Sequence, residues 1–327
     1  MLIRALCLSC SCSSHYLEQA VELKQFFTKR KRLKMFSIIV PSYNRHTEIP
    51  ALLASLTEQT QQNFEVVIVD DCSQTPVIVT ENYGFHVQVI RNAQNQGAAE
   101  SRNIGACHAQ HEWLLFLDDD DRFAPEKCAM LMESIKANPD INFIYHPAKC
   151  VMVNEGFSYV TNPTDPTQIN VDNILLANKI GGMPMVAIQK AFFFELGGLS
   201  NDLKSLEDYD FMLKVASSAK LRAFRLDAPL SICGFHTKRA SVSTNTSNTE
   251  KAIAVIREKF VKTETQEKNF AINALYMLAY PCAMNLSRQA ASYYFKMFQL
   301  SHSPKHLAIA LLTFISPKLA INMKRFF

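Results

Sequence analysis

The sequence predicts an α/β fold in which a doubly wound sheet is flanked by helices. Two observations support this prediction. Between residues 36 and 145, short apolar runs rich in β-branched residues alternate with segments whose apolar residues recur at helical spacing. Strands that alternate with helices in this way usually form a parallel sheet covered on both faces. The 327 residues are enough for one large domain and a smaller one.

The expected elements follow one another along the chain. Continuous apolar runs predict strands at 36–40, 64–69, 87–90, 113–117 and 141–145. Apolar residues at i, i+3, i+4 and i+7 predict helices, as in Ile49, Leu52, Leu53 and Leu56. Further helices are expected at 97–110, from about Pro125 to Asn138, and at 211–216, and Gly197-Gly198 is expected to end another. From about Glu250 the chain is expected to be helical, interrupted at Pro281, Pro304 and Pro317.

Charge is unevenly distributed along the chain. Residues 1–34 carry seven Lys/Arg and two Glu, and residues 268–327 carry seven Lys/Arg and no carboxylate side chain. Because the whole chain carries only +4, the segment between them is acidic. The sequence therefore predicts a basic N-terminal extension at 1–34, an acidic α/β domain at 35–249 and a basic helical region at 250–327.

Composition narrows the functional classes. Nine cysteines are an odd number with no framework spacing, which favours a reducing cytoplasm, and Cys7, Cys10 and Cys12 match no zinc-site spacing. No run reaches the roughly 18 apolar residues that a membrane-spanning helix needs. The basic cluster 29–34 stands beside no nucleic-acid-binding motif, so no nucleic-acid partner is predicted.

Polar residues follow three of the expected strands, where an open α/β sheet binds its ligands. These are the segments 41–44, 70–71 and 118–121. Four adjacent aspartates repel one another unless a cation relieves them. Mg²⁺ binds through one or two carboxylates together with water and substrate phosphates. Asp118 and Asp120 would point the same way in an extended chain, so the run indicates a divalent-metal site; a solvated turn or helix cap is the alternative.

Four other positions carry chemistry but are ambiguous when taken singly. Asp71 suits a nucleotide contact or an ordinary Asx turn. Arg102 suits a phosphate contact or a surface position. Glu207 and Asp208 suit a general base or the acidic first turn of a helix. His236 suits a ligand or a structural role.

Six segments, in order, resemble the family-2 inverting glycosyltransferases of the GT-A fold. They cover about residues 36–245 and read SIIVPSYNR (37–45), FEVVIVDDCS (64–73), NQGAAESRNIG (95–105), WLLFLDDDDRFAP (113–125), GGLSNDLKSLEDYDFMLKVA (197–216) and FHTKRASVS (235–243). The resemblance implies a mixed sheet flanked by helices, with 35–249 as the catalytic domain and a helical C-terminal extension. Asp119 departs from the family, which often has Ser, Ala or Thr there, and Cys72-Ser73 replaces the usual Gly-Ser or Asn-Ser.

The resemblance also implies a role for each matched residue. Pro41 and Tyr43 would lie beneath the nucleotide base, Asp71 would accept from the base N–H, and Arg102 would lie near the diphosphate. Asp118 and Asp119 would contact the ribose or donor sugar. Asp120 would bind Mn²⁺ or Mg²⁺, with His236 approaching the metal or diphosphate. Asp208 would be the catalytic base with Glu207 beside it, whereas Asp121 is expected only as a helix-start charge.

The expected activity is therefore inverting transfer from a nucleotide sugar, by resemblance a UDP-sugar, to a glycan or lipid-linked acceptor of a surface polysaccharide or lipopolysaccharide. A non-catalytic sugar-nucleotide-binding protein of the same fold is the alternative, and a phospho-receiver module is excluded by the chain's length and its second acidic cluster. The basic helical region 268–327 suits either an anionic membrane surface on the cytoplasmic face of the inner membrane or a cap packed on the catalytic domain.

Overall fold

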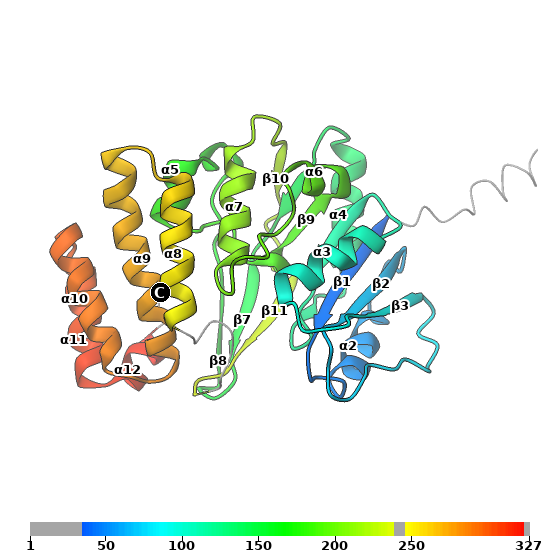
Figure 1. Cartoon of the computed structure of the whole chain (residues 1–327), viewed down its shortest axis with the longest axis horizontal. Coiled ribbons are helices and arrows are strands. Elements are labelled where there is room, and N and C mark those ends of the chain that lie inside the picture. Colours follow the sequence, from blue (N-terminus) through cyan, green and yellow to red (C-terminus); the bar gives the residue numbers. More distant parts are fainter. Residues whose placement is uncertain (1–34, 239–245, 324–327) are drawn as a thin grey trace, which may run out of the picture. The chain divides into compact units, whose positions relative to one another are not determined.

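The computed structural model describes residues 35–238 and 246–323, and the expected extension at 1–34 lies outside these described residues. A seven-stranded mixed sheet forms the centre, in the order β10-β6-β9-β4-β1-β2-β3 (Figure 1). Its strands are β1 (Phe36–Ser42), β2 (Phe64–Asp70), β3 (His86–Arg91), β4 (Trp113–Phe116), β6 (Phe143–Tyr145), β9 (Val186–Gln189) and β10 (Ala223–Arg225). Strand β9 runs antiparallel to β4 and β6, and the other pairings are parallel. The α/β fold with a mixed sheet is thus confirmed.

Helices cover both faces of this sheet. They are α2 (Ile49–Leu56), α3 (Ala98–His108), α4 (Lys127–Ala137), α5 (Val171–Leu176), α6 (Lys190–Glu195) and α7 (Glu207–Ser217), with 3₁₀ turns at Pro166–Gln168 and Met183–Met185. Strand β1 shows the division, because Ile38 packs with α2 and α4 on one face while Ile39 packs with α3, α6 and α7 on the other. Burial of β1 and β2 on both faces explains their continuous apolar sequence.

A second, four-stranded sheet in the order β5-β11-β7-β8 was not predicted from the sequence. It contains β5 (Arg122–Phe123), β7 (Ala148–Met152), β8 (Phe157–Val160) and β11 (Ser231–Phe235). These strands are short, and β8 alternates half-buried and exposed residues, so no continuous apolar run marks them. Strand β5 directly follows the aspartate run and pairs with β11, so this sheet fixes the chain at the C-terminal end of the run.

The C-terminal region is helical, as expected, and comprises α8 (Thr246–Phe260), α9 (Glu264–Met284), α10 (Gln289–Ser301), α11 (Pro304–Ile315) and α12 (Pro317–Asn322). Pro304 and Pro317 stand in the first turns of α11 and α12, where a missing N–H costs nothing. Pro281 does not interrupt the chain as predicted but lies inside α9, only three residues before the helix ends. Its lost hydrogen bond falls in the last turn, and the buried ring of Pro281 packs there.

Helix α9 packs directly on the α/β part of the fold. Phe270 and Ala274 join the same apolar cluster as α5 and α7. The buried Asn273 amide donates to the carbonyl of Leu175 at 3.0 Å and to Tyr209 Oη at 3.1 Å. Of the two roles expected for the basic helical region, a packed cap therefore applies at least to α9. Residues from Met35 onward form one compact unit, so a domain boundary at 249 stays a sequence-based prediction. Among the described residues, no helix has the length and hydropathy that crossing a membrane requires.

Candidate active site

The aspartate run lies where β1, β2 and β4 end, at the edge expected to bind ligand. Ser42, the last residue of β1, donates its hydroxyl to Asp119 Oδ2 at 3.3 Å, and its carbonyl accepts from the N–H of Asp71 at 2.8 Å. The three segments that follow these strands are therefore in direct contact. The side chain of Tyr43 is half exposed at this edge. Pro41 lies within β1, at a position that pairs with β2. Both lie where a nucleotide base is expected, and that role stays a prediction.

Asp71 is buried and anchors the loop before α3. Its carboxylate accepts from the backbone N–H groups of Gln96 and Gly97, at 2.8 and 2.7 Å, and from the Asn92 amide at 2.8 Å. An Asx turn was one of the two roles expected for Asp71. The structure shows instead that its carboxylate bonds to residues distant in sequence, just before α3. Contact with a nucleotide base stays a prediction for Asp71.

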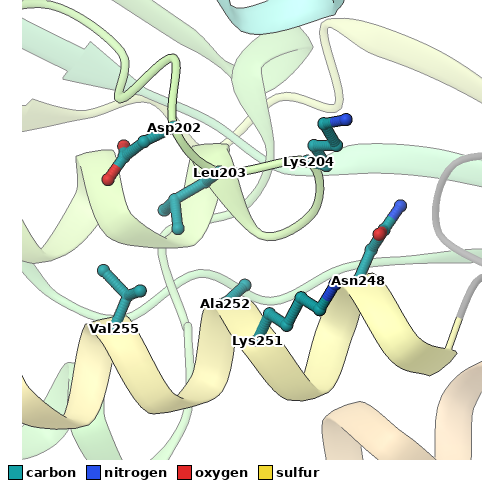
Figure 2. Close-up of a pocket in the computed structure, with 7 residues that line it drawn as sticks. All are labelled: Asp202, Leu203, Lys204, Asn248, Lys251, Ala252 and Val255. Atoms are coloured by element: carbon teal, nitrogen blue, oxygen red, sulfur yellow. The ribbon is translucent and has the colours of Figure 1, made fainter.

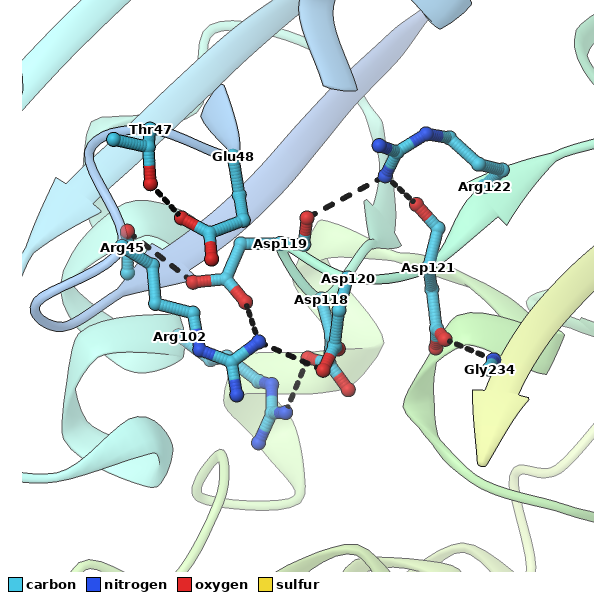
Figure 3. A network of polar contacts seen from close by, with 11 residues as sticks. Arg45, Thr47, Glu48, Arg102, Asp118, Asp119, Asp120, Asp121, Arg122 and Gly234 are labelled. Atoms are coloured by element: carbon cyan, nitrogen blue, oxygen red, sulfur yellow. Dashed lines mark hydrogen bonds and ion pairs between the residues drawn. The ribbon is translucent and has the colours of Figure 1, made fainter. Parts of the chain in front are cut away.

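The four aspartates have four different surroundings (Figure 3). The side chains of Asp118 and Asp120 are each 34% exposed, whereas Asp119 and Asp121 are buried, as alternation in an extended chain predicts. Asp121 was expected as a helix-start charge, and this was wrong. Its Oδ1 accepts from the Gly234 N–H at 3.1 Å, and strand β5 separates it from α4. Asp121 therefore joins the aspartate loop to β11.

Arg102 is the buried centre that joins the separate acidic segments. Its Nη2 donates to Asp118 Oδ1 at 2.7 Å, and its Nη1 donates to Glu207 Oε1 at 3.1 Å. Burial opposes the guanidinium charge, but the two carboxylates outweigh it and raise the pKa of Arg102. Since Asp118 follows β4 and Glu207 begins α7, one side chain joins the aspartate run to the segment expected to carry the base.

Asp208 lies in the first turn of α7, which begins at Glu207 rather than at Phe211 as predicted. Leu206 precedes it with a left-handed backbone, at φ 62°. Burial and the neighbouring Glu207 carboxylate raise the pKa of Asp208 to about 6, although the Tyr209 N–H donates to its Oδ1 at 2.7 Å. A Cβ on Gly182 would stand 3.5 Å from Asp208 Oδ2, so the turn before β9 lies directly against this carboxylate.

Burial also raises the pKa values of Asp119 and Asp121 to about 7, with repulsion from neighbouring aspartates adding to it. For Asp119 the nearby Arg45 guanidinium acts in the opposite direction. The site brings Asp118 to Asp121, Glu207 and Asp208 together with Arg45 and Arg102, so its carboxylates outnumber the arginines that pair with them. An acidic site in this state fits a divalent cation.

His236 directly follows β11, two residues after Gly234. Within residues 35–238 and 246–323, no group of three or more His, Cys, Asp or Glu side chains is placed to hold a metal ion. Mg²⁺ needs only one or two protein carboxylates when substrate phosphates supply other ligands. Metal binding by Asp120 and His236 stays a prediction.

Two residues near the site carried no predicted role. Arg45 bonds to Asp119 and Asp120. Its position just after the polar segment that ends a strand could have indicated that it lies at the site. Lys127 is fully buried and donates to the Pro184 carbonyl at 2.7 Å and to Ser231 Oγ at 3.0 Å. Its sequence position, in the first turn of a helix, did not indicate that the side chain would be buried. Burial lowers the pKa of Lys127 to about 7.

A shallow hollow of about 190 Å³ lies between the 202–204 loop and α8 (Figure 2). Leu203, Ala252 and Val255 line its apolar side. It contains none of the predicted site residues and shows instead how α8 packs beside the loop that leads into α7.

Comparison with known proteins agrees with this architecture. An uncharacterised glycosyltransferase of Haemophilus influenzae is 62% identical over 291 residues, covering 89% of this chain and 99% of the relative. The glucosyltransferase WfgD of Escherichia coli, named as acting from UDP-Glc on α-D-GlcNAc-diphosphoundecaprenol, is 27% identical over 248 residues, covering 75% of this chain and 92% of the relative.

Among solved structures, TarS of S. aureus in complex with UDP-GlcNAc superposes with a TM-score of 0.57 at 20% identity, covering 89% of this chain and 92% of that chain. This likeness supports the GT-A fold. The Glycosyl transferase family 2 profile matches residues 37–194. Together with the 62% identical relative, it establishes that the chain belongs to glycosyl transferase family 2.

Proposed function

We propose that this chain is an inverting glycosyltransferase that moves a sugar from a UDP-sugar to a hydroxyl of a glycan or lipid-linked acceptor. One observation carries the proposal. Arg102 binds Asp118 and Glu207 at once, at 2.7 and 3.1 Å, so the strand-end carboxylates and the expected base belong to one site. The neighbouring Asp208 carboxylate, half-buried and with a raised pKa, favours an enzyme over a non-catalytic sugar-nucleotide-binding protein.

The donor would occupy the edge formed by the ends of β1, β2 and β4. Tyr43 offers a half-exposed ring for a base, and Asp71 fixes the loop that begins α3. Asp118 and Asp119 are the proposed contacts to the ribose or sugar. The cluster's excess of carboxylates fits Mn²⁺ or Mg²⁺, which Asp120 would hold with help from His236. When bound, such an ion offsets the charge that develops on the leaving diphosphate.

Asp208 is the proposed general base. Its pKa of about 6 leaves it ionised at neutral pH yet basic enough to take a proton. The acceptor oxygen forms the new bond to the anomeric carbon while the bond to the diphosphate oxygen breaks, and the hydroxyl proton passes to Asp208. The nucleoside diphosphate leaves with the bonding electrons. A single displacement of this kind inverts the anomeric configuration.

Relatives support the donor and acceptor classes. WfgD is named for transfer from UDP-Glc to a diphosphoundecaprenol-linked sugar, and TarS was solved with UDP-GlcNAc. AmsB of Erwinia amylovora, 29% identical over 140 residues, is named for amylovoran biosynthesis. A lipid-linked acceptor in a surface-polysaccharide pathway is therefore the class that we propose.

The proposed acceptor suggests contact with a membrane, and the outer face of α11 suits it. Leu311, Phe314 and Ile315 are 56%, 66% and 66% exposed there. Lys305 and Lys318 flank them, and no carboxylate side chain occurs after Glu267. An apolar face on a segment whose charged side chains are all basic complements anionic lipid. We propose that this face rests on the cytoplasmic leaflet of the inner membrane.

Turnover of nucleotide sugars tests the enzymatic proposal. A panel of UDP- and GDP-sugars with Mn²⁺ or Mg²⁺ should reveal a donor that raises the melting temperature and is slowly hydrolysed. Asp120→Ala should abolish hydrolysis. Asp208→Asn should still bind the donor but lose about 10²–10⁴-fold in transfer rate, the usual contribution of a general base. A folded Asp208→Asn protein that transfers at the wild-type rate would rule out this base, and absence of donor binding across the panel would favour another function.

A further inference from the structure

The guanidinium of Arg45 already places a positive charge where the proposed metal would bind. Its Nη1 lies 3.1 Å from Asp119 Oδ1 and 2.7 Å from Asp120 Oδ2, so one nitrogen bridges two neighbouring carboxylates (Figure 3). The Arg45 side chain is 26% exposed, which leaves it a path into solvent. By contrast, Arg102 is buried and turned to Asp118 and Glu207.

The Arg45 guanidinium is shared by two carboxylates in a crowded acidic loop. Asp119 is 8% exposed, and Ser42 Oγ at 3.3 Å is its other side-chain hydrogen-bond donor. Asp120 stands between two further aspartates. A positive charge at the bridging position therefore lowers the repulsion among the loop's carboxylates.

The backbone beside Arg45 is fixed, so movement falls to the side chain. Asn44 has a left-handed backbone with φ of 55°. Its N–H donates to Ser73 Oγ at 2.8 Å, and its side-chain oxygen accepts from the Gln74 N–H at 2.8 Å. These bonds pin the loop after β1 to the loop after β2. Rotation of the long Arg45 side chain is then the least costly way to free Asp120.

We infer that Arg45 is the resident counter-ion of the metal site and competes with the divalent ion for Asp120. This inference rests on the proposed metal-dependent function. Arg45 bonds to Asp120 Oδ2 at 2.7 Å, so a divalent ion on the same carboxylate would stand close to the guanidinium, and two cations a few ångströms apart repel each other. The nucleotide-free protein therefore binds the ion weakly, and the negative diphosphate of the donor is what makes displacement of the guanidinium favourable.

Binding of Mn²⁺ without nucleotide tests the inference, with free Mn²⁺ followed by electron paramagnetic resonance. Arg45→Met keeps the length of the side chain and removes its charge, and should bind Mn²⁺ about tenfold more tightly than wild type. Arg122→Met is the matched control. Arg122 begins β5 directly after the aspartate run, and it donates to the carbonyls of Asp119 and Asp121, at 3.4 and 2.6 Å, rather than to carboxylates. Its Mn²⁺ affinity should stay at the wild-type value.

Two further variants sharpen the outcome. The double variant Arg45→Met/Asp120→Asn should lose the gain, and Arg45→Gln serves if Arg45→Met fails to fold, as judged by its melting curve. If wild type binds Mn²⁺ in the presence of UDP but the Arg45 variants bind it no more tightly without UDP, the competition is wrong and the metal site survives. If no variant binds Mn²⁺ even with UDP, the metal site fails and the inference fails with it.

Discussion

Burial of Asp208 favours its proposed role as a general base but lowers the stability of the folded protein at neutral pH. Its pKa is raised from 3.8 to about 6, chiefly by burial and then by Glu207. Below about pH 4 the carboxyl is protonated in both the folded and the unfolded chain, and folding is not penalised. Between about pH 4 and 6 the unfolded chain loses its proton first, so the folded state loses stability as pH rises. Above pH 6 the penalty is complete.

We therefore expect Asp208→Asn to stabilise the metal-free protein at pH 7.5. The raised pKa of Asp208 corresponds to at most about 2–3 kcal/mol. At pH 4 the variant and wild type should be nearly equal. Melting temperatures of the two proteins across pH 4–8 check this. An equal or larger gain at pH 4 would show that ionisation of Asp208 is not the cause.

At the scale of elements, Arg102 is what assembles the site. It lies on α3 and binds carboxylates from the segment after β4 and from the start of α7. These elements are distant in sequence, and no local pattern would bring them together. Breaking a buried ion pair by removing one partner leaves the other charge uncompensated.

Arg102→Met should accordingly lower the free energy of unfolding by about 3–5 kcal/mol. Arg102→Lys should recover only part of this, because an ammonium cannot fork between two carboxylates. Lys220→Met is the control, since Lys220 pairs with Glu195 at 2.6 Å with side chains 71% and 45% exposed. That change should cost under about 1 kcal/mol. Urea unfolding measures all three, and a loss for Arg102→Met no larger than for Lys220→Met would contradict this role.

At the scale of the whole molecule, the sequence predicted the fold class, the main strands and the ligand edge. Strands β1, β2 and β4 are buried on both faces, so their apolar runs were unambiguous. Strands β7, β8 and β11 were missed because more buried residues in them alternate with more exposed ones, so no continuous apolar run marks them. Motifs placed Asp118, Asp120 and Asp208 near the site, but the partners of Arg45 and the anchoring by Asp121 depend on side-chain geometry that spacing does not encode.

The exposed face of α11 also belongs to this scale, and vesicle flotation tests its proposed contact. The full-length protein should float with phosphatidylglycerol-containing vesicles and not with pure phosphatidylcholine. Phe314→Ser/Ile315→Ser should abolish flotation. Ile78→Ser, at a residue 76% exposed and outside the C-terminal helices, should not. If the double variant instead converts a dimer to a monomer in light scattering, the face binds a second copy and the membrane proposal is wrong.

The amide of Asn273, which bonds Leu175 and Tyr209, has a practical consequence. Tyr209 is the residue next to Asp208, so the turn that carries the proposed base rests on a helix that begins fifteen residues beyond the expected domain boundary. A shortened version ending at 249 would lose this support and uncover the apolar surface beneath Phe270 and Ala274. The C-terminal helical region is therefore not an interchangeable module, and a minimal working enzyme has to retain at least α9.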